Sequence, residues 1–137
     1  MSEKVQRIDH QDGVPRPYGA ATLFGGLVFP CGQIPTRADG SVPSEIADQV
    51  TVVLDNLERA LLAAGSHLGN ILQLTVYLAD LTEFDAYNVA YLERLAGYAL
   101  PPRTTVQVAG FRGEKRIEIS AIAARGAASS SNEGKQS

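Results

Sequence analysis

The sequence predicts an α+β domain in which two helices cover one face of a mixed sheet. Apolar residues recur at helical spacing in residues 46–64 and 84–95, and shorter strand-like segments flank both. The resulting order, β-β-α-β-α-β-β, is typical of helices packed on one side of a sheet. The chain of 137 residues is long enough for one domain. We expect this domain at residues 15–125, with flexible ends at 1–14 and 126–137.

The first two strands, residues 20–24 and 27–29, are expected to form a hairpin. Gly25-Gly26 between them supplies the positive φ that a tight turn requires. Pro30 has no N–H to donate, so the second strand is either an edge or carries a bulge at that point.

Both helices carry end signals. Ser44 is the expected N-cap of the first helix and Gly65 its C-terminal stop. The second helix is expected to open at Thr82, with Asp85 in the capping-box position. The two apolar stripes contain Ile46, Val50, Val53, Leu54, Leu57, Leu61 and Ala64, then Phe84, Tyr87, Asn88, Tyr91, Leu92 and Leu95.

The later strands divide their side chains between two faces. In residues 71–79, alternation places four aliphatic residues together against the helices: Leu72, Leu74, Val76 and Leu78. The opposite face is expected to carry Gln73, Thr75, Tyr77, Thr105, Gln107, Glu118 and Ser120. Such a face is either solvated, as in many antiparallel sheets, or a wet subunit interface. The periodicity leaves both open.

Composition excludes several classes of function. The net charge is -3 with acids and bases interspersed, so we expect no nucleic-acid or membrane partner. A single cysteine cannot form an internal disulfide and fits a reducing compartment. Cys31, His10 and His67 are too scattered for a metal site. With no signal-like or long apolar segment, the expected location is cytoplasmic.

Arg103 and Glu118 are the candidate functional pair. Pro101 and Pro102 fix the chain just before Arg103, and Glu118 is the lone carboxylate of the strand-like run at 116–123. A restrained guanidinium binds a carboxylate bidentately, and a nearby carboxylate can manage water, which together predict a small hydrolytic site. The alternative is a structural ion pair across two strands on a solvated face.

Several motifs, in this order and spacing, resemble the RidA/YjgF family of reactive intermediate deaminases over residues 15–125. They are Pro17-Tyr18, Cys31-Gly32-Gln33-Ile34-Pro35, Ala63-Ala64-Gly65, Thr75-Val76-Tyr77-Leu78, Phe84 with Asn88 and Tyr91, Pro102-Arg103-Thr104, and Ile117-Glu118-Ile119. The resemblance implies a chorismate-mutase-like fold assembled as a homotrimer. The mixed polar and apolar character of the Glu118 face predicts that the trimer interface uses this face of the sheet. Each trimer would hold three sites between subunits, without metal or organic cofactor.

The resemblance also implies the reaction and the roles of residues. The substrates would be enamine or imine acids such as 2-aminoacrylate, hydrolysed to a keto acid and ammonia. Arg103 would hold the substrate carboxylate with help from the backbone N–H of Thr105, and Glu118 would activate water. An iminium carbon is already electrophilic, so orientation, an anchor and one proton-handling group suffice.

The resemblance assigns supporting roles to three more residues, and each has a structural alternative. Tyr18 would wall the pocket, or it is a packing aromatic. Gly32 would let the backbone approach the ligand, or it is a turn glycine. Asn88 would support the site, or it satisfies a neighbouring backbone group. Cys31 is most simply a small buried residue.

The chain departs from the usual family pattern around the pocket. Arg16-Pro17-Tyr18-Gly19-Ala20 replaces Gly-Pro-Tyr-Ser-Gln, and Pro30-Cys31 stands where a β-former and serine are usual. Thr105 replaces a frequent cysteine, and Ser120 a second glutamate. These changes make a pathway-specific imine or amino-diene acid an alternative to simple enamines.

Three functions compete on the sequence. The first is the enamine or imine deaminase. The second is a non-catalytic ligand-binding or chaperone-like trimer of the same family. The third is an endoribonuclease, which the acidic balance and the lack of a basic-aromatic stripe disfavour.

Overall fold

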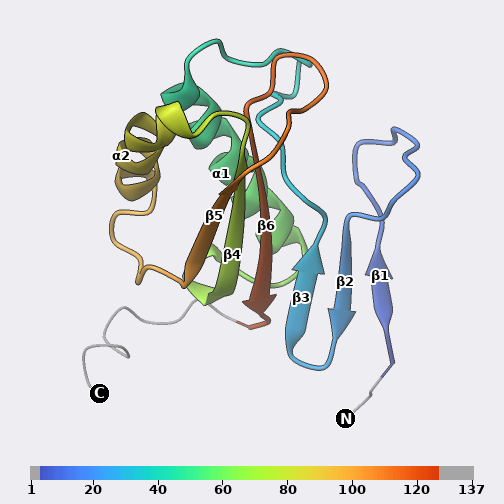
Figure 1. The fold of residues 1–137 in the computed structure, drawn as a ribbon. Coiled ribbons are helices and arrows are strands. Elements are labelled where there is room, and N and C mark those ends of the chain that lie inside the picture. Colours follow the sequence, from blue (N-terminus) through green and yellow to red (C-terminus); the bar gives the residue numbers. More distant parts are fainter. Residues whose placement is uncertain (1–3, 127–137) are drawn as a thin grey trace.

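The computed structural model describes residues 4–126. Two helices pack on one face of a six-stranded mixed sheet of order β1-β2-β3-β6-β4-β5 (Figure 1), which confirms the predicted α+β class. The elements are β1 (Gln6–Ile8), β2 (Ala21–Phe24), β3 (Leu27–Pro30), α1 (Ile46–Ala63), η1 (Leu68–Asn70), β4 (Ile71–Leu78), η2 (Leu81–Glu83), α2 (Phe84–Arg94), β5 (Arg103–Gln107) and β6 (Ile117–Ala124), where η denotes a short 3-10 helix.

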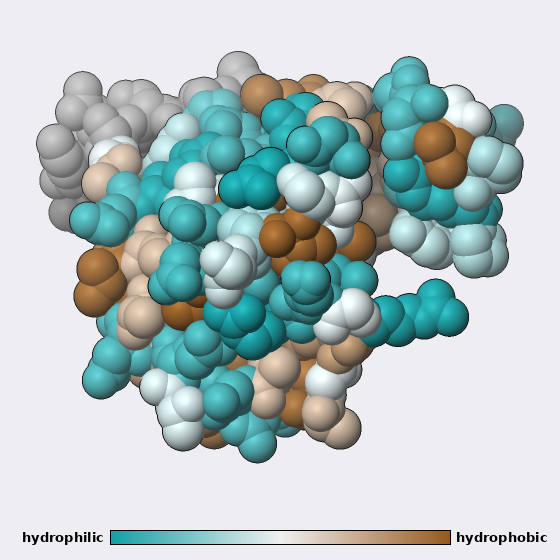
Figure 2. Space-filling view, turned by 90° about the horizontal axis from the view of Figure 1, so that it is seen from above, coloured by the Kyte–Doolittle hydropathy of each residue, from teal (hydrophilic) through white to brown (hydrophobic). Residues whose placement is uncertain are grey.

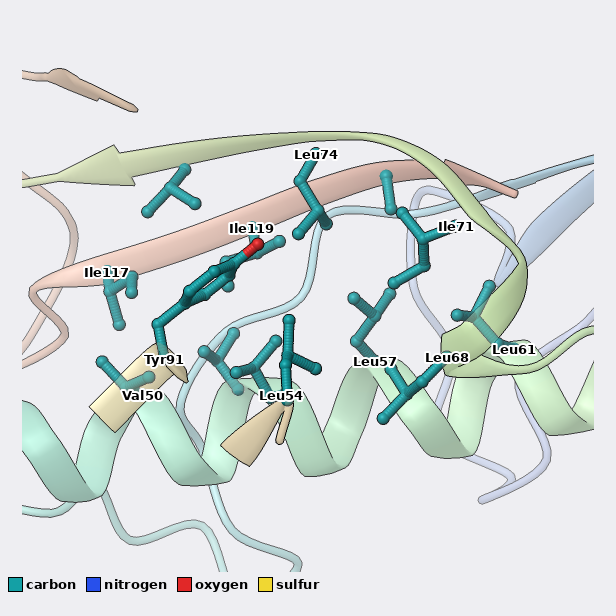
Figure 3. Packing of buried hydrophobic residues seen from close by; sticks show 14 of the residues in the cluster. Val50, Leu54, Leu57, Leu61, Leu68, Ile71, Leu74, Tyr91, Ile117 and Ile119 are labelled. Atoms are coloured by element: carbon teal, nitrogen blue, oxygen red, sulfur yellow. The ribbon is translucent and has the colours of Figure 1, made fainter. Parts of the chain in front are cut away.

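The core lies between the helices and the sheet. Leu54 and Leu57 of α1 are fully buried and lie near Leu74 and Ile119 of the central strands (Figure 3). Burial of the α1 stripe provides most of the packing energy of this helix, because removal of apolar surface from water is the main favourable term. No helix within residues 4–126 is both long and apolar enough to cross a bilayer.

The register around Pro30 creates a local irregularity beside β6. β3 pairs with β6 at Val28↔Ala123, and the chain meets β6 again at Gln33↔Ile119. Five steps along the first segment (33 − 28) therefore span four along β6 (123 − 119), so one residue must bulge out. This agrees with the expected edge or bulge at Pro30, and it places Cys31 and Gly32 out of the regular ladder.

The helix starts differ from the predicted caps. The N-cap of α1 is Glu45, without a side-chain cap bond, and the Ser44 carbonyl instead accepts from Arg116 Nη2 at 2.9 Å. Before α2, Asp80 Oδ1 accepts from the backbone N–H of Thr82 at 2.9 Å and starts η2. This carboxylate satisfies an otherwise unpaired donor one turn earlier than the predicted capping box with Asp85.

Two aliphatic assignments were wrong. The register shifts between Ile71 and Gln73, so Leu72 turns outward and 48% of it is exposed. In α2, Leu92 is 44% exposed, and Ala90 is buried in its place beside Tyr91. Both errors arise where an ideal period is interrupted or offset by a residue.

Residues 6–8 form β1 within the segment that was expected to lack regular structure. They pair antiparallel with β2, for example Arg7↔Thr22, and backbone hydrogen bonding does not require the aliphatic alternation that was absent there. The expectation for the C-terminal tail falls outside the described residues beyond Gly126.

Candidate active site

The candidate site residues lie on opposite faces of the sheet. Thr105 of β5 pairs with the buried Val76 of β4, whereas Glu118 of β6 pairs with the next residue, Tyr77. Paired residues project to the same side and neighbours along a strand to opposite sides. Arg103 and Thr105 therefore face the helices and Glu118 faces away from them.

This arrangement corrects two sequence-based interpretations. Thr105 and Gln107 do not share the face of Glu118, and Thr104 and Val106 take their places through pairing with Thr75 and Tyr77. An Arg103–Glu118 ion pair on a common face is also wrong. The grouping failed because alternation tells which residues of one strand share a face but not which of the two faces the helices cover.

Arg103 lies at the start of edge strand β5 in a group that we call the arginine cluster: Arg103, Asn88, Phe84, Tyr87 and Tyr91. Its Nη1 donates to Asn88 Oδ1 at 2.8 Å. Its guanidinium carbon lies 4.6 Å, 5.2 Å and 5.8 Å from the ring centroids of Tyr91, Tyr87 and Phe84. Cation–π contacts of this kind orient a guanidinium and still leave its N–H edge for ligands.

Most of the donors of Arg103 remain available. Asn88 Oδ1 is its one hydrogen-bond acceptor within residues 4–126, and a guanidinium has five N–H groups. The start of β5 is fixed by the N–H of Leu74, which donates to the Pro102 carbonyl at 2.9 Å. The side-chain oxygen of Asn88 thus accepts from the arginine, and not from a neighbouring backbone N–H as the structural alternative had it. The arrangement suits bidentate recognition of a carboxylate.

Tyr87 and Tyr91 belong to the arginine cluster, although neither was predicted as a candidate site residue. The Tyr87 hydroxyl and Thr105 Oγ1 are hydrogen-bonded at 2.8 Å. The Tyr91 hydroxyl is buried without a hydrogen-bond partner among the described residues, and Figure 3 shows its ring among the core side chains. Burial raises the pKa of both phenols. Three aromatic residues at positions 84, 87 and 91 on the stripe that carries Asn88 were the available signal.

Glu118 belongs to a second group, the glutamate cluster: Glu118, Gly32, Cys31 and Gln33. The backbones of Gln33 and Ile119 exchange hydrogen bonds of 2.8 Å and 3.0 Å, which hold the bulged segment against β6. Gly32 then lies directly over the Glu118 side chain, where a Cβ atom would collide with Oε2. An added Cβ at position 32 would therefore displace the Glu118 side chain, so Gly32 allows a close approach and is not merely a turn glycine.

The glutamate cluster favours a protonatable carboxyl. Burial raises the pKa of Glu118, and the positive charge of Lys115 opposes this in part. Burial also raises the pKa of the Cys31 thiol, which keeps it protonated and disfavours a nucleophilic role. The amide of Gln33 donates to the Cys31 carbonyl at 2.8 Å.

Tyr18 lies in the loop between β1 and β2, which stands apart from the helical layer (Figure 1). Tyr18 is 53% exposed, so it is not part of the core of the single chain. The edge of the His10 ring contacts it at a centroid distance of 5.4 Å. Arg16 pairs with Asp12 at 2.6 Å, which holds the pKa of that carboxyl well below its usual range. The charge of Arg16 is thus already matched.

The end of the molecule above the sheet carries mainly hydrophilic residues around small hydrophobic areas (Figure 2). One shallow hollow there, of about 560 Å³, is bordered by polar loop residues such as Ser41, Glu114 and Lys115. It contains no residue of either cluster. Within residues 4–126, no group of three or more His, Cys, Asp or Glu is placed to hold a metal ion.

Comparison with known proteins gives the family. The family model of endoribonuclease L-PSP matches residues 12–125. Reactive intermediate deaminase TdcF of Escherichia coli is 35% identical over 130 residues, covering 91% of this chain and 99% of the relative. The 2-iminobutanoate/2-iminopropanoate deaminase of Escherichia coli is 35% identical over 112 residues, covering 80% and 88%.

Solved structures agree with this. The crystal structure of Escherichia coli TdcF with bound serine superimposes with a TM-score of 0.80 at 34% identity, covering 88% of this chain and 98% of TdcF. The YjgF gene product of Escherichia coli gives a TM-score of 0.77 at 33% identity, covering 87% and 94%. With relatives of this kind over most of its length, this small α+β domain is a deaminase-like enzyme. The chain belongs to the RidA/YjgF family of reactive intermediate deaminases.

Proposed function

We propose that the protein hydrolyses small enamine or imine acids to a 2-keto acid and ammonia. The main support for this proposal is that the two clusters offer different groups, a hydrogen-bond donor in one and a protonatable carboxyl in the other. Arg103 offers unoccupied donors to a carboxylate, and Glu118 has a raised pKa suited to taking and returning a proton. The names of the two Escherichia coli deaminases support the same chemistry.

The steps balance with these two groups and solvent water. The substrate carboxylate binds Arg103, with the backbone N–H of Thr105 assisting, and solvent first protonates the enamine at carbon to give the iminium. Glu118 then accepts a proton from water as the water oxygen bonds to the iminium carbon. Glu118 returns that proton to the amino nitrogen, which becomes a leaving group. The C–N bond then breaks to release ammonia, and the hydroxyl of the addition product gives its proton to solvent as the keto group forms. Orientation contributes most, because the carbon is already electrophilic.

We propose that the active protein is a homotrimer whose sites lie between subunits. Arg103 and Glu118 lie two strands apart and on opposite faces, so one small substrate does not contact both within a chain. A second copy that places its glutamate cluster against the arginine cluster would complete the site, with Tyr18 as a wall. An interface between two different surfaces of the same chain repeats from copy to copy. It gives a closed ring of subunits when the rotation between neighbouring copies closes the circle.

The Glu118 face has the composition of an interface. Leu27 and Phe29 of β3 and Val106 of β5 project from this face, and 36%, 38% and 39% of them are exposed. Apolar side chains gathered beside polar ones mark interaction surfaces. Light scattering in dilute solution should report three chains, and a stable monomer would contradict both the trimer and the shared site.

A coupled assay tests the reaction. A pyridoxal-phosphate dehydratase acting on serine or threonine generates 2-aminoacrylate or 2-iminobutyrate in place, and semicarbazide traps whatever imine remains. The protein should speed keto acid release and lower the yield of trapped imine, whereas an Arg103→Ala variant should not. Binding of the keto acid without faster hydrolysis would favour the non-catalytic ligand-binding alternative instead.

A further inference from the structure

A hydroxyl pair lies next to Arg103 and takes no part in the steps above. Tyr87 Oη and Thr105 Oγ1 are 2.8 Å apart and link α2 to the edge strand β5. Thr105 is two residues from Arg103, so both side chains leave the same face of the strand roughly 7 Å apart at their Cα atoms. The guanidinium carbon also lies 5.2 Å from the Tyr87 ring centroid. A ligand bound to Arg103 therefore lies beside this pair.

The direction of this hydrogen bond determines what Thr105 can offer. Tyr87 is fully buried, and Thr105 Oγ1 is the one hydrogen-bond partner of its hydroxyl within residues 4–126. A buried O–H without an acceptor is costly, so donation from Tyr87 to Thr105 is favoured. Burial raises the pKa of Tyr87, which keeps this proton in place at neutral pH.

Thr105 then has its own proton to donate. Its oxygen accepts from Tyr87, and no second partner of the Thr105 hydroxyl is present in the described part of the chain. Thr105 is only half-buried, and it lies on β5, an edge strand that has a neighbouring strand on one side alone. A hydroxyl that accepts one hydrogen bond becomes a better donor in the next, because such chains polarise cooperatively.

We propose that the Thr105 hydroxyl is an additional substrate-binding donor, oriented by Tyr87, for the same acid group that Arg103 anchors. Tyr87 is then a positioning residue that acts through Thr105. The inference rests on the proposed function, since it assigns a second side-chain donor to the carboxylate of that substrate. This second donor makes the site selective for a carboxylate over a neutral amide of the same shape, because both oxygens of a carboxylate accept hydrogen bonds whereas the amide NH2 donates them.

The test is calorimetric titration of the assembled protein with 2-ketobutyrate and with its primary amide. Thr105→Val removes the hydroxyl and keeps the shape, and it should weaken keto acid binding about tenfold or more, as expected for a hydrogen bond to a charged group. Thr105→Ser should retain most of the affinity. Tyr87→Phe should weaken binding severalfold, and the double variant should be no worse than Thr105→Val, because Tyr87 acts through Thr105.

The controls separate the failure of this inference from failure of the function. Thr51→Val removes an exposed hydroxyl of α1 and should leave affinity unchanged. Keto acid binding that is lost in Arg103→Ala but unchanged in Thr105→Val and Tyr87→Phe would overturn the inference and leave the function intact. A wild-type protein that neither binds the keto acid nor hydrolyses imines would overturn both. Tyr87→Phe removes a single oxygen atom, so it gives an answer even if Thr105→Val folds poorly.

Discussion

The backbone of Gly32 lies directly against the carboxylate of Glu118, so any side chain at position 32 would meet that carboxylate. A Cβ at position 32 would collide with Oε2 of Glu118 and would lie 3.3 Å from its Cδ. The bulge after Pro30 brings the backbone to this point, and the Gln33–Ile119 bridge holds it there. The position of Glu118, the group that we propose handles the proton, therefore depends on a residue that has no side chain.

We predict that Gly32→Ala folds but loses activity. The colliding atoms are the far end of a flexible side chain, so Glu118 can move aside with little change in Tm. A displacement of about 1 Å costs on the order of a hundredfold in rate. The readouts are kcat/KM for the generated imine and Tm. Gly26→Ala is the matched control, because an added Cβ there meets nothing within 4 Å. Equal activity of the two variants would show that the contact has no role in positioning Glu118.

Glu118→Gln should bind the keto acid but hydrolyse imines about a hundredfold or more slowly, because an amide cannot accept a proton from water at neutral pH. Ser120→Ala on the same strand should be mild, since an unactivated hydroxyl is a poor base. In the wild type, burial raises the pKa of Glu118 above its ordinary 4.5, so kcat/KM should fall on an acid limb centred above pH 4.5. If Ser120→Ala lost activity while Glu118→Gln kept it, Ser120 rather than Glu118 would be the base.

The same raised pKa has a consequence for stability. A carboxyl that binds its proton more tightly in the folded state stabilises the protein below its unfolded pKa, and that contribution is lost as pH rises through the folded pKa. Glu118→Gln, which stays neutral, should therefore match the wild type near pH 4 and have a higher Tm at pH 7. A lower Tm for the variant at pH 7 would mean that ionised Glu118 is stabilised by a partner outside this chain.

The sequence predicted every helix and strand longer than three residues and named Arg103 and Glu118 as candidates, but it did not predict how these two residues lie relative to each other. The hairpin and α1 depend on local signals, Gly25-Gly26 and the stripe ending at Gly65, and both were found where expected. Arg103 and Glu118 were named as candidates from their residue types and neighbours. Their placement on opposite faces depends on the parallel pairing of β5 with β4, which joins residues about thirty positions apart and leaves no local signal.

The details missed at the site have similar causes. The Tyr87–Thr105 hydrogen bond joins a helix to a strand that was assigned the wrong face, and the contact of Gly32 with Glu118 depends on a bulge. The family resemblance supplied residue identities but not these contacts. Thr105 and Tyr87 are linked by tertiary packing, which neither periodicity nor motif spacing encodes.

Subunit mixing should restore activity from two inactive proteins. Arg103→Ala and Glu118→Gln should each be inactive alone, but a site shared between copies can combine the intact arginine of one chain with the intact glutamate of another. After joint unfolding and refolding of equal amounts, random assembly leaves about a quarter of the sites with both groups, so about a quarter of the activity should return. Mixing without unfolding should restore little at first. If no activity returns in a protocol that refolds the wild type, either both groups act within one subunit or at least one of them has no role in the site.

Tyr91→Phe should stabilise the protein. The Tyr91 hydroxyl is buried without a partner among residues 4–126, and only 2% of the residue is exposed. An unsatisfied buried polar group costs about 1–3 kcal/mol, whereas phenylalanine keeps the ring that lies 4.6 Å from the Arg103 guanidinium. We therefore expect unfolding free energy to rise by about 1 kcal/mol and Tm by a few degrees. Tyr98→Phe, at a ring that is only partly buried against His67, is the control and should change Tm little. If Tyr91→Phe lowers Tm while Tyr98→Phe does not, the Tyr91 hydroxyl has a partner in the assembled protein, either an ordered water or a group from a second copy. In that case a fall in keto acid affinity would identify the hydroxyl as part of the arginine cluster's binding surface, and unchanged affinity would restrict its role to packing.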